Sequence, residues 1–454
     1  MKVSKIIFLI ATIVGCNTSK NQGYTAKTWD EIGHTPFSEI KSGIPAFDKT
    51  VITYRYAGKV AMKVNLGRPA VVAVASKEEG WGFFQFPDIF LSLDNEVVAT
   101  WNMAADAISS YGKGGQSFSV SRDNGNSWNP ATSEPVIGGG LILPDGDRIR
   151  IYTPQALKVE DLHLPEPVWS STTHPDSKGI TYLYKVNELP EYLQGVYIDR
   201  LRKGERNWST EHAVLDDPLA VRYSRSGLFP VVWWGDLHIA ADGSILAGTY
   251  PGFYLKPDGK VDPSGVFFYC STDEGHTWKI RSRIDYLPDL KVDPNGDKRL
   301  IRGFGEPAFE ILSDGSFLCV MRTSDGLGIS PMYFTRSVDM GLTWSKPVPF
   351  TRNGVKPRLL QLDNGVIVLV SGRPGVQLRF CTDGKGEKWT DPFEMLPYEN
   401  DKEPVTCGYT ELLVTGKDRF LVIYSDFKYQ NQAGETRKAI KVREVKVSSN
   451  KAHN

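Results

Sequence analysis

Six polar side chains that could take part in catalysis stand near the ends of strand-like stretches in the second half of the chain. They are His238, Glu306, Arg322, Arg358, Arg373 and Tyr409. A tyrosine hydroxyl next to a carboxylate can act as a nucleophile, and guanidinium groups bind carboxylates through paired hydrogen bonds. A histidine and a tyrosine can also work together as base and acid. These residue types therefore indicate a reaction on an acidic substrate.

The stretches that carry most of these side chains share one layout, in which a strand, a turn containing Asp and Gly and a second strand follow one another. One copy spans residues 304–322, another 357–373 and a third 408–426. Each copy predicts a β-hairpin. Hairpins packed around one axis would bring their polar strand ends into a single funnel, although these residues are far apart in the sequence.

An eight-residue turn pattern, S-x-D-x-G-x-[ST]-W, recurs along the chain. It reads SRDNGNSW at 121–128, STDEGHTW at 271–278 and SVDMGLTW at 337–344, and weaker copies stand at 381–389 and 200–208. In such a turn the Asp and Ser side chains can bond backbone amides, Gly adopts a positive φ, and Trp packs onto the unit. Units of roughly 45 to 70 residues, made of strands without long amphipathic helices, predict an all-β fold, a β-propeller of six blades with seven as the alternative.

This turn pattern resembles the Asp-box of the sialidase superfamily, whose members are six-bladed β-propellers. The resemblance covers most of the chain, from residue 84 to residue 445. Glu306-Pro307 and Arg322 match the family's site glutamate and second site arginine, and Tyr409 in GYTELL matches its nucleophilic tyrosine. The resemblance implies a hydrolase that removes a terminal acidic sugar.

Several other positions follow from the same resemblance. A phenol suits a reacting carbon that carries a carboxylate, because a carboxylate nucleophile would be repelled there. Arg358 or Arg373 would stand for the third arginine, and Asp106 would protonate the leaving oxygen. The family's first arginine, in the motif R-I-P, is replaced in Gln85-Phe86-Pro87. Gln85 can offer hydrogen bonds to a substrate but no charge.

A second enzymatic function is also open. The chain resembles, more distantly, propeller polysaccharide lyases of the ulvan-degrading type, which eliminate at a uronic acid, and a dehydratase that removes water from a uronic acid would use the same residues. His238 and Tyr409 would then act as base and acid, while Arg322 or Arg373 neutralises the carboxylate.

A third possibility is a glycan-binding lipoprotein without catalytic activity. Aromatic residues make up 11% of the chain, and we expect Trp101 and Trp234 to contact the sugar. The 53 acidic and 53 basic residues cancel, which argues against a nucleic-acid-binding surface. The cysteine spacing fits no zinc motif, and we expect no metal and no cofactor.

The first residues predict export. A basic start, an apolar stretch at 6–14 and the sequence Ile13-Val14-Gly15-Cys16 resemble a bacterial lipoprotein signal. We expect a signal peptide at 1–15, lipidation of Cys16, a tether over 16–30 and one propeller domain over 31–448. The protein would then lie in the periplasm or on the outer membrane, attached to lipid through this anchor only.

Two expectations concern the ends and the loops of the fold. Strand candidates at 51–54 and 71–74 should close the propeller together with the C-terminal strands. The segment 158–178, which contains Trp169 and His174, is expected to be an irregular loop that roofs the site.

Overall fold

The structure is a computed structural model that describes residues 37–42, 48–135, 137–172, 179–232, 234–325, 330–398 and 404–449. For residues 37–42 and 234 it describes the backbone only. The predicted signal peptide, Cys16, the tether and His174 lie outside the described residues. In the described part, no helix is long and apolar enough to cross a membrane. The helical elements there are 3-10 turns: η3 (Ile108–Ser110), η4 (Val159–Asp161), η5 (Val186–Glu188), η6 (Glu191–Leu193) and η7 (Gly296–Lys298).

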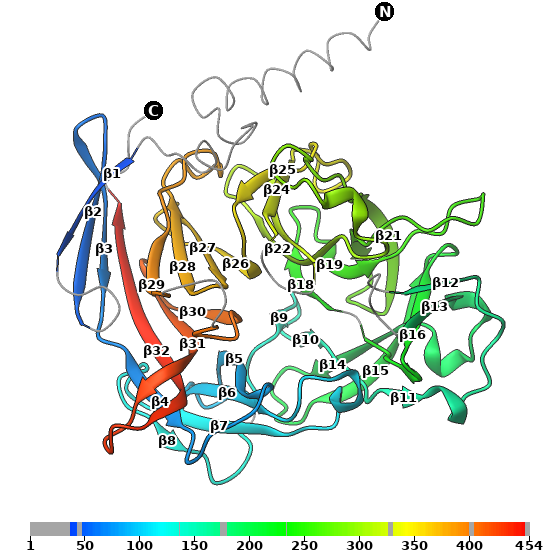
Figure 1. Ribbon diagram of the computed structural model, residues 1–454, viewed down its shortest axis with the longest axis horizontal. Coiled ribbons are helices and arrows are strands. Elements are labelled where there is room, and N and C mark those ends of the chain that lie inside the picture. Colours follow the sequence, from blue (N-terminus) through cyan, green and yellow to red (C-terminus); the bar gives the residue numbers. More distant parts are fainter. Residues whose placement is uncertain are drawn as a thin grey trace, which may run out of the picture.

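The strands form mainly antiparallel sheets arranged around a common centre, with β5, β9, β18, β22, β26 and β30 as the end strands toward it (Figure 1). The first sheet contains β5 (Phe83–Leu91), β6 (Val97–Met103), β7 (Gln116–Ser121) and β8 (Asn129–Pro130). The next group contains β9 (Leu141–Ile142), β10 (Arg148–Ile151), β14 (Val196–Leu201) and β15 (Ser209–Asp216). It is joined through a parallel pairing of β15 with β21 to β18 (Trp234–Ile239), β19 (Ile245–Gly252), β20 (Gly265–Ser271) and β21 (Thr277–Ile284).

Two further sheets follow in chain order. One contains β22 (Phe304–Ile311), β23 (Phe317–Thr323), β24 (Met332–Ser337) and β25 (Val348–Thr351). The other contains β26 (Val355–Gln361), β27 (Ile367–Gly372), β28 (Val376–Cys381) and β29 (Phe393–Leu396). Every residue of β23 and β27 is buried, because each of these strands is covered by neighbouring sheets on both faces. A continuous apolar run is typical of such a strand.

Both ends of the described chain contribute to the last sheet. It joins β30 (Thr410–Gly416), β31 (Arg419–Gln430) and β32 (Thr436–Ser449) to β4 (Ala70–Val74), which pairs with β32. The other part of β32 pairs with β3 (Lys59–Leu66), which continues through β2 (Thr50–Tyr56) to β1 (Phe37–Ser42). The expected pairing of 71–74 with the C-terminal strands is therefore observed. The prediction of an all-β propeller is confirmed, whereas the choice between six and seven blades stays a prediction.

A smaller sheet lies beside this ring and corrects one expectation. It has the order β11 (Leu157–Lys158), β17 (Leu228–Phe229), β16 (Val221–Arg225), β13 (Ile180–Lys185) and β12 (Trp169–Thr172). The segment 158–178 was expected to be an irregular loop, but its residues 169–172 pair with β13. The sequence Trp-Ser-Ser-Thr gives little apolar alternation because β12 is an edge strand whose residues stay partly exposed.

The repeated turns have the predicted local geometry. In the copy at 271–278, Ser271 Oγ accepts a hydrogen bond from Gly275 N at 2.8 Å, and Asp273 Oδ1 accepts one from Thr277 N at 2.8 Å. Trp278 Nε1 donates to Gly275 O at 2.9 Å, and Gly275 has φ +92°. Each clear copy connects the third and fourth strands of its sheet, and the weak copy at 200–208 connects β14 to β15 in the same way.

Candidate active site

Three of the innermost strands contain the same β-bulge, which begins at a residue followed by proline. The residue pairs are Phe86-Pro87 in β5, Glu306-Pro307 in β22 and Lys356-Pro357 in β26, and in each case the register with the neighbouring strand shifts there. Proline fits a bulge because it has no N–H to donate to the ladder. The three residues before proline have positive φ values of +50°, +45° and +44° in chain order. A positive φ is uncommon for residues with a side chain and occurs where the surrounding structure enforces it.

The three bulged residues meet at Tyr409. The Tyr409 hydroxyl donates a hydrogen bond to Glu306 Oε1, and the Phe86 ring packs edge-on against the Tyr409 ring at 5.0 Å. Lys356 Nζ lies over the same ring, 5.8 Å from its centroid. The bulges therefore turn three strand ends toward one tyrosine that comes from a fourth sheet.

Glu306 is the centre of the contacts in this cluster. Its Oε1 accepts a hydrogen bond from Arg322 Nη1 at 2.8 Å as well as the one from Tyr409, and its Oε2 accepts one from the backbone N–H of Lys356 at 2.8 Å. Glu306 is 5% exposed and Arg322 is 8% exposed, so the ion pair is almost withdrawn from water. The pairing of Gly305 with Arg322 across β22 and β23 fixes this contact.

The charges around Glu306 decide the protonation states of the cluster. Burial alone would raise the pKa of Glu306, but Arg322, Lys356 and the hydrogen bond from Tyr409 outweigh burial and lower this pKa below its ordinary value. Burial and the negative charge of Glu306 hold the pKa of Tyr409 well above its ordinary value. Near neutral pH the pair is therefore a carboxylate beside a neutral phenol.

Close backbone approach positions Tyr409. Gly408 has φ +83°, and a Cβ at this residue would lie 2.6 Å from Arg373 Cγ and 2.8 Å from Val355 Cγ2. The preceding Cys407 accepts a hydrogen bond on its carbonyl oxygen from Arg373 Nε at 3.0 Å. Only glycine fits this position, because any side chain would push the segment away from β26 and β27.

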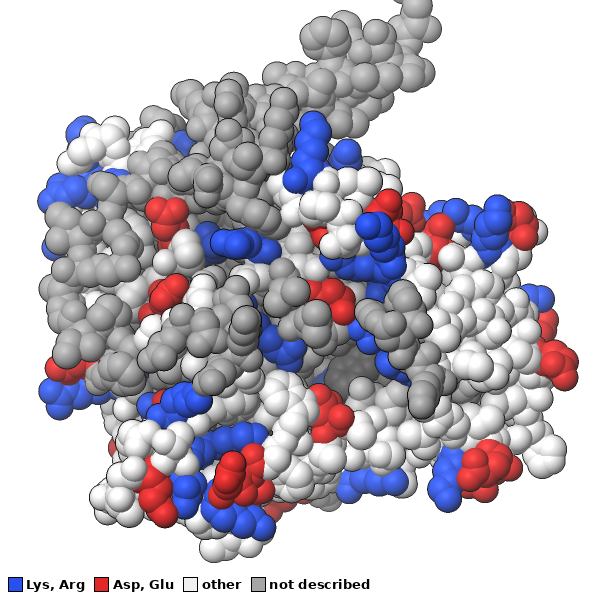
Figure 2. All heavy atoms as spheres, viewed as in Figure 1, with Lys and Arg blue, Asp and Glu red and all other residues white. Residues whose placement is uncertain are grey.

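The rim of the site contains the candidate acid. The Arg373 guanidinium lies over the Trp81 ring at 5.5 Å, and Trp81 Nε1 donates to Asp106 Oδ2 at 2.8 Å. Asp106 is exposed. Burial raises the pKa of Tyr111, and the negative charges of Asp106 and Glu306 raise it further. Tyr111 therefore lies within electrostatic range of both carboxylates. Basic and acidic side chains both reach the middle of this face (Figure 2).

Arg358 forms two ion pairs with other sheets, and its expected role in substrate binding stays a prediction. Its Nη1 lies 2.5 Å from Asp236 Oδ1 and its Nη2 lies 2.5 Å from Glu411 Oε2. Arg358 is two residues beyond Lys356 on β26, on the other side of the bulge at Lys356-Pro357. Burial raises the pKa of Glu411 to about 7 despite the opposing charge of Arg358, and Asp88 and Asp236 add to the rise.

His238 lies apart from Tyr409. Its Nδ1 is 3.8 Å from Glu310 Oε1, and its ring packs against Phe309 at 4.4 Å. Glu310 is four residues beyond Glu306 on β22, on the other side of the bulge at Glu306-Pro307. The structure therefore does not bring together the acid–base pair expected for a lyase.

Two further expectations from the sequence are corrected. Gln85 is fully buried, and its side-chain amide makes no hydrogen bond to the described residues. Trp101 is 5% exposed and packs within the apolar cluster between the first and last sheets, where it stacks on Phe84 at 6.0 Å. Neither side chain can contact a sugar from these positions. Trp234 begins β18, but its side chain lies outside the described residues.

Sequence reasoning missed Lys356 and Phe86. The available signal was the repeated residue-proline pair, because Phe86-Pro87 and Lys356-Pro357 occupy the same place in their strands as Glu306-Pro307. The resemblance to the motif R-I-P instead predicts Gln85 as the site residue, which lies one residue before Phe86 at this bulge.

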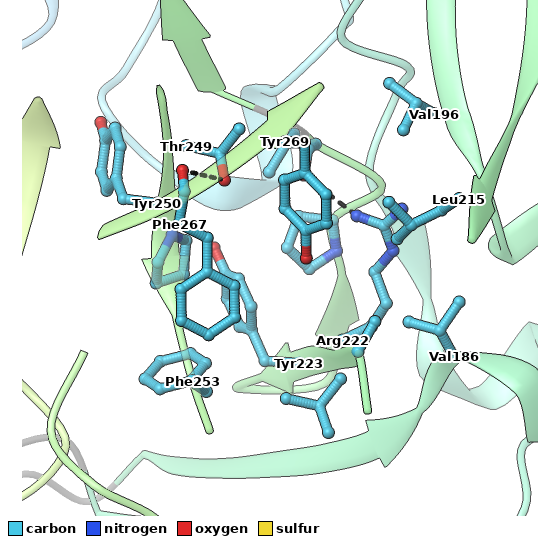
Figure 3. A pocket seen from close by; sticks show the side chains of 15 residues that line it. Val186, Val196, Leu215, Arg222, Tyr223, Thr249, Tyr250, Phe253, Phe267 and Tyr269 are labelled. Carbon is cyan, nitrogen blue, oxygen red and sulfur yellow. Dashed lines mark hydrogen bonds between the residues drawn. The ribbon is translucent and has the colours of Figure 1, made fainter. Parts of the chain in front are cut away.

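A small cavity of about 60 Å³ is lined by residues of β16, β19 and β20 (Figure 3). Its lining is largely apolar and includes the aromatic residues Tyr223, Tyr250, Phe253, Phe267 and Tyr269. Burial and then the charge of Glu306 raise the pKa of Tyr250 well above its ordinary value, which relates this cavity to the Tyr409 site. Among the described residues, no group of three or more His, Cys, Asp or Glu side chains is arranged to hold a metal ion.

Comparison with known proteins shows similarity at the level of structure. No family model and no curated protein matches the chain. The chain is similar to a protein of unknown function from Dyadobacter fermentans DSM 18053, with a TM-score of 0.56 and 18% identity over 85% of this chain and 99% of that chain. This likeness concerns the fold alone.

Two enzymes are similar at lower scores. One is an alpha-L-arabinanase from Penicillium chrysogenum complexed with arabinobiose, with a TM-score of 0.42 and 17% identity over 79% of this chain and 92% of that chain. The other is the NanB sialidase from Streptococcus pneumoniae, with a TM-score of 0.41 and 12% identity over 84% of this chain and 70% of that chain. Likenesses at these scores carry no argument about the chemistry of this site.

Proposed function

We propose that this protein is a carbohydrate-active enzyme that hydrolyses the bond to a terminal acidic sugar, with Tyr409 as the nucleophile. The observation that carries the proposal is the hydrogen bond from the Tyr409 hydroxyl to Glu306 Oε1, on a carboxylate that is also paired with Arg322 at 2.8 Å. A buried tyrosine whose hydroxyl donates directly to an ionised carboxylate has the arrangement of a nucleophile with its base. Such a phenol can attack where a carboxylate on the substrate would repel a carboxylate nucleophile.

The proposed reaction runs in two steps. The Tyr409 oxygen forms a bond to the anomeric carbon while its proton passes to Glu306, and the bond to the leaving oxygen breaks. Asp106 would protonate that oxygen, after which water releases the sugar from Tyr409. Arg322 keeps Glu306 ionised before the reaction, because it lowers the pKa of this carboxyl.

Cations around Tyr409 supply the acidic specificity that we propose. Lys356 Nζ lies over the tyrosine ring and the Arg373 side chain lies at the rim, while Gln85 is buried and Arg358 is engaged in ion pairs. A lysine is a point charge without the two-point geometry of arginine. We therefore propose that Lys356 and Arg373 hold the sugar carboxylate together with the remaining N–H groups of Arg322.

The test is a panel of sialylated, ulosonic-acid and uronic-acid oligosaccharides incubated with the mature protein, with products identified by mass. We expect a released acidic monosaccharide. Tyr409→Phe should abolish this release, whereas Tyr192→Phe, at a 48% exposed tyrosine, should keep it. Near-normal turnover by Tyr409→Phe would refute the proposal.

The same panel addresses the two other functions. Unsaturated products that absorb in the near ultraviolet would mean elimination at a uronic acid. Retained binding without any product would leave a glycan-binding protein. The separation of His238 from Tyr409 is the reason why we rank elimination below hydrolysis.

We also propose that the protein is exported and attached to the membrane surface through lipid on Cys16. This proposal depends on the sequence of the first 16 residues. A surface location would place the enzyme where polysaccharide fragments first reach the cell.

A further inference from the structure

Two arginines near the candidate active site form no ion pair with any residue that the structure describes. Arg225, at the end of β16, and Arg302, two residues before β22, are both partly buried, and neither side chain forms an ion pair or hydrogen bond with the described residues. By contrast, Arg299 pairs with Asp293 at 2.7 Å and Arg322 pairs with Glu306 at 2.8 Å. A partly buried guanidinium without a partner is costly unless another group satisfies it.

The backbone places Arg302 at the site end of β22. Gly303 O accepts a hydrogen bond from Ser324 N at 2.7 Å, and Gly305 pairs with Arg322. Arg302 therefore lies at the same end of this sheet as Arg322 and Glu306, just before the residues of β22 that pair with β23.

The small sheet brings Arg225 to the same region. Ile301 belongs to an apolar cluster against which Tyr223 packs, and Tyr223 also lines the cavity of Figure 3. Residues two apart on a strand share a face, so Arg225 lies on the face of β16 that carries Tyr223. Arg225 and Arg302 thus lie near the same contact, in which the small sheet packs against the propeller through Tyr223 and Ile301.

Electrostatic interactions agree with this placement. Burial lowers the pKa of Arg302, and the positive charges of Arg225 and Arg322 lower it further, against the opposing charge of Asp325. The charge of Arg225 lowers the pKa of Tyr111, and the charge of Glu306 raises it. Both charges therefore act on the same tyrosine, which relates Arg225 to the Tyr409 cluster. Arg302 therefore has two other positive charges in its surroundings, beside a site that is proposed to bind an acidic sugar.

We propose that Arg225 and Arg302 form a second oxyanion-binding position beside Arg322, so that the substrate carries a further carboxylate or sulfate ester beyond the sugar attacked by Tyr409. The proposal rests on the proposed function for the orientation of the substrate, but the anion position itself does not require hydrolysis. Guanidinium groups bind both kinds of oxyanion through two-point hydrogen bonds. A substrate with two anionic groups would neutralise these two arginines, which form no ion pair with the described residues.

Inorganic sulfate and acetate are suitable probes of this position. Each anion is titrated into the mature protein by calorimetry, with ionic strength kept constant by sodium chloride so that general screening does not change. The variants are Arg225→Gln and Arg302→Gln. Arg122→Gln is the matched control, because Arg122 lies in a repeated turn and pairs with Glu96 at 2.6 Å.

We expect saturable binding of at least one anion, weakened about 10-fold or more in Arg225→Gln and Arg302→Gln, because each loses a charge-assisted contact. Arg122→Gln should bind like the parent. Arg302→Lys, which keeps the charge, should retain more affinity than Arg302→Gln and guards against a loss caused by misfolding. The anion that binds more tightly indicates whether the second group is a sulfate ester or a carboxylate.

Equal affinities in the parent and both glutamine variants would overturn the proposal, as would the absence of saturable binding at constant ionic strength. Tyr409→Phe separates this result from the proposed function. If that variant binds the anion normally while the parent hydrolyses nothing on the panel, the hydrolase is refuted and the anion position stands.

Discussion

Replacing Glu306 by glutamine should destabilise the fold, because this carboxylate has three partners. It accepts hydrogen bonds from Arg322, from the backbone N–H of Lys356 and from Tyr409, and it is 5% exposed. Glutamine keeps an oxygen acceptor but leaves the Arg322 charge without its counter-ion. Breaking a buried ion pair in this way costs about 3–5 kcal/mol, and we expect the lower end because one acceptor remains.

Glu310→Gln is the matched control on the same strand. Burial raises the pKa of Glu310, and its Oε1 lies 3.8 Å from Nδ1 of His238, with no arginine or lysine paired to it among the described residues. Losing its charge should therefore change the free energy of unfolding by less than about 1 kcal/mol. Urea unfolding at neutral pH, followed by tryptophan fluorescence, compares the two variants with the parent.

The pH dependence of this difference provides a second check. The folded-state pKa of Glu306 is lowered, so its stabilising contribution is complete above the unfolded pKa of about 4.3 and is lost as pH falls through the folded pKa. The gap between the parent and Glu306→Gln should therefore shrink as pH is lowered below about 4. A Glu306→Gln variant no less stable than Glu310→Gln, or a gap independent of pH, would refute this account of the ion pair.

Three more predictions concern other parts of the molecule. Burial raises the pKa of Glu411 to about 7, so the parent should lose stability as pH rises through the interval from about 4.3 to about 7. Glu411→Gln should show a smaller loss between those pH values in urea unfolding, and an unchanged slope would contradict the assignment. Gly408→Ala should lower hydrolysis at least about 10-fold by displacing Tyr409, and it should destabilise the protein more than Gly434→Ala. Gly434 has a similar φ, +77°, but nothing lies within 4 Å of an added Cβ there, so equal effects of the two substitutions would exclude the steric explanation. Cys16→Ala should abolish incorporation of labelled fatty acid and release the protein from the membrane fraction, and labelling that persists would exclude this cysteine as the anchor.

Local sequence predicted the repeated turns and the inner hairpins because short-range contacts determine them. The Ser271, Asp273 and Gly275 interactions occur within five residues, so a spacing pattern contains all the information needed. The same is true of the turn at 314–315, where Ser316 N donates to Asp314 Oδ1 at 3.0 Å. The repetition of these units was enough to predict a propeller, and hence that distant strand ends converge.

The prediction that the strand ends converge also placed Tyr409, Glu306 and Arg322 in one cluster, as the structure has them. Their contacts follow from the hairpin layout together with the positions of polar residues at strand ends. The sequence did not reveal which residue of each strand end faces the centre. A bulge changes the alternation of side chains locally, so Phe86 and Lys356 face Tyr409 while Gln85 is buried.

The sequence alone determined the all-β architecture, the turn chemistry and the set of polar side chains available at the centre. Only the tertiary structure decided which of these side chains are free to act. Arg358 is occupied by Asp236 and Glu411, which come from two other sheets, while Arg225 and Arg302 have no such partner among the described residues. The physical reason is that ion pairing depends on distances across the propeller axis, and neither composition nor spacing along the chain contains those distances.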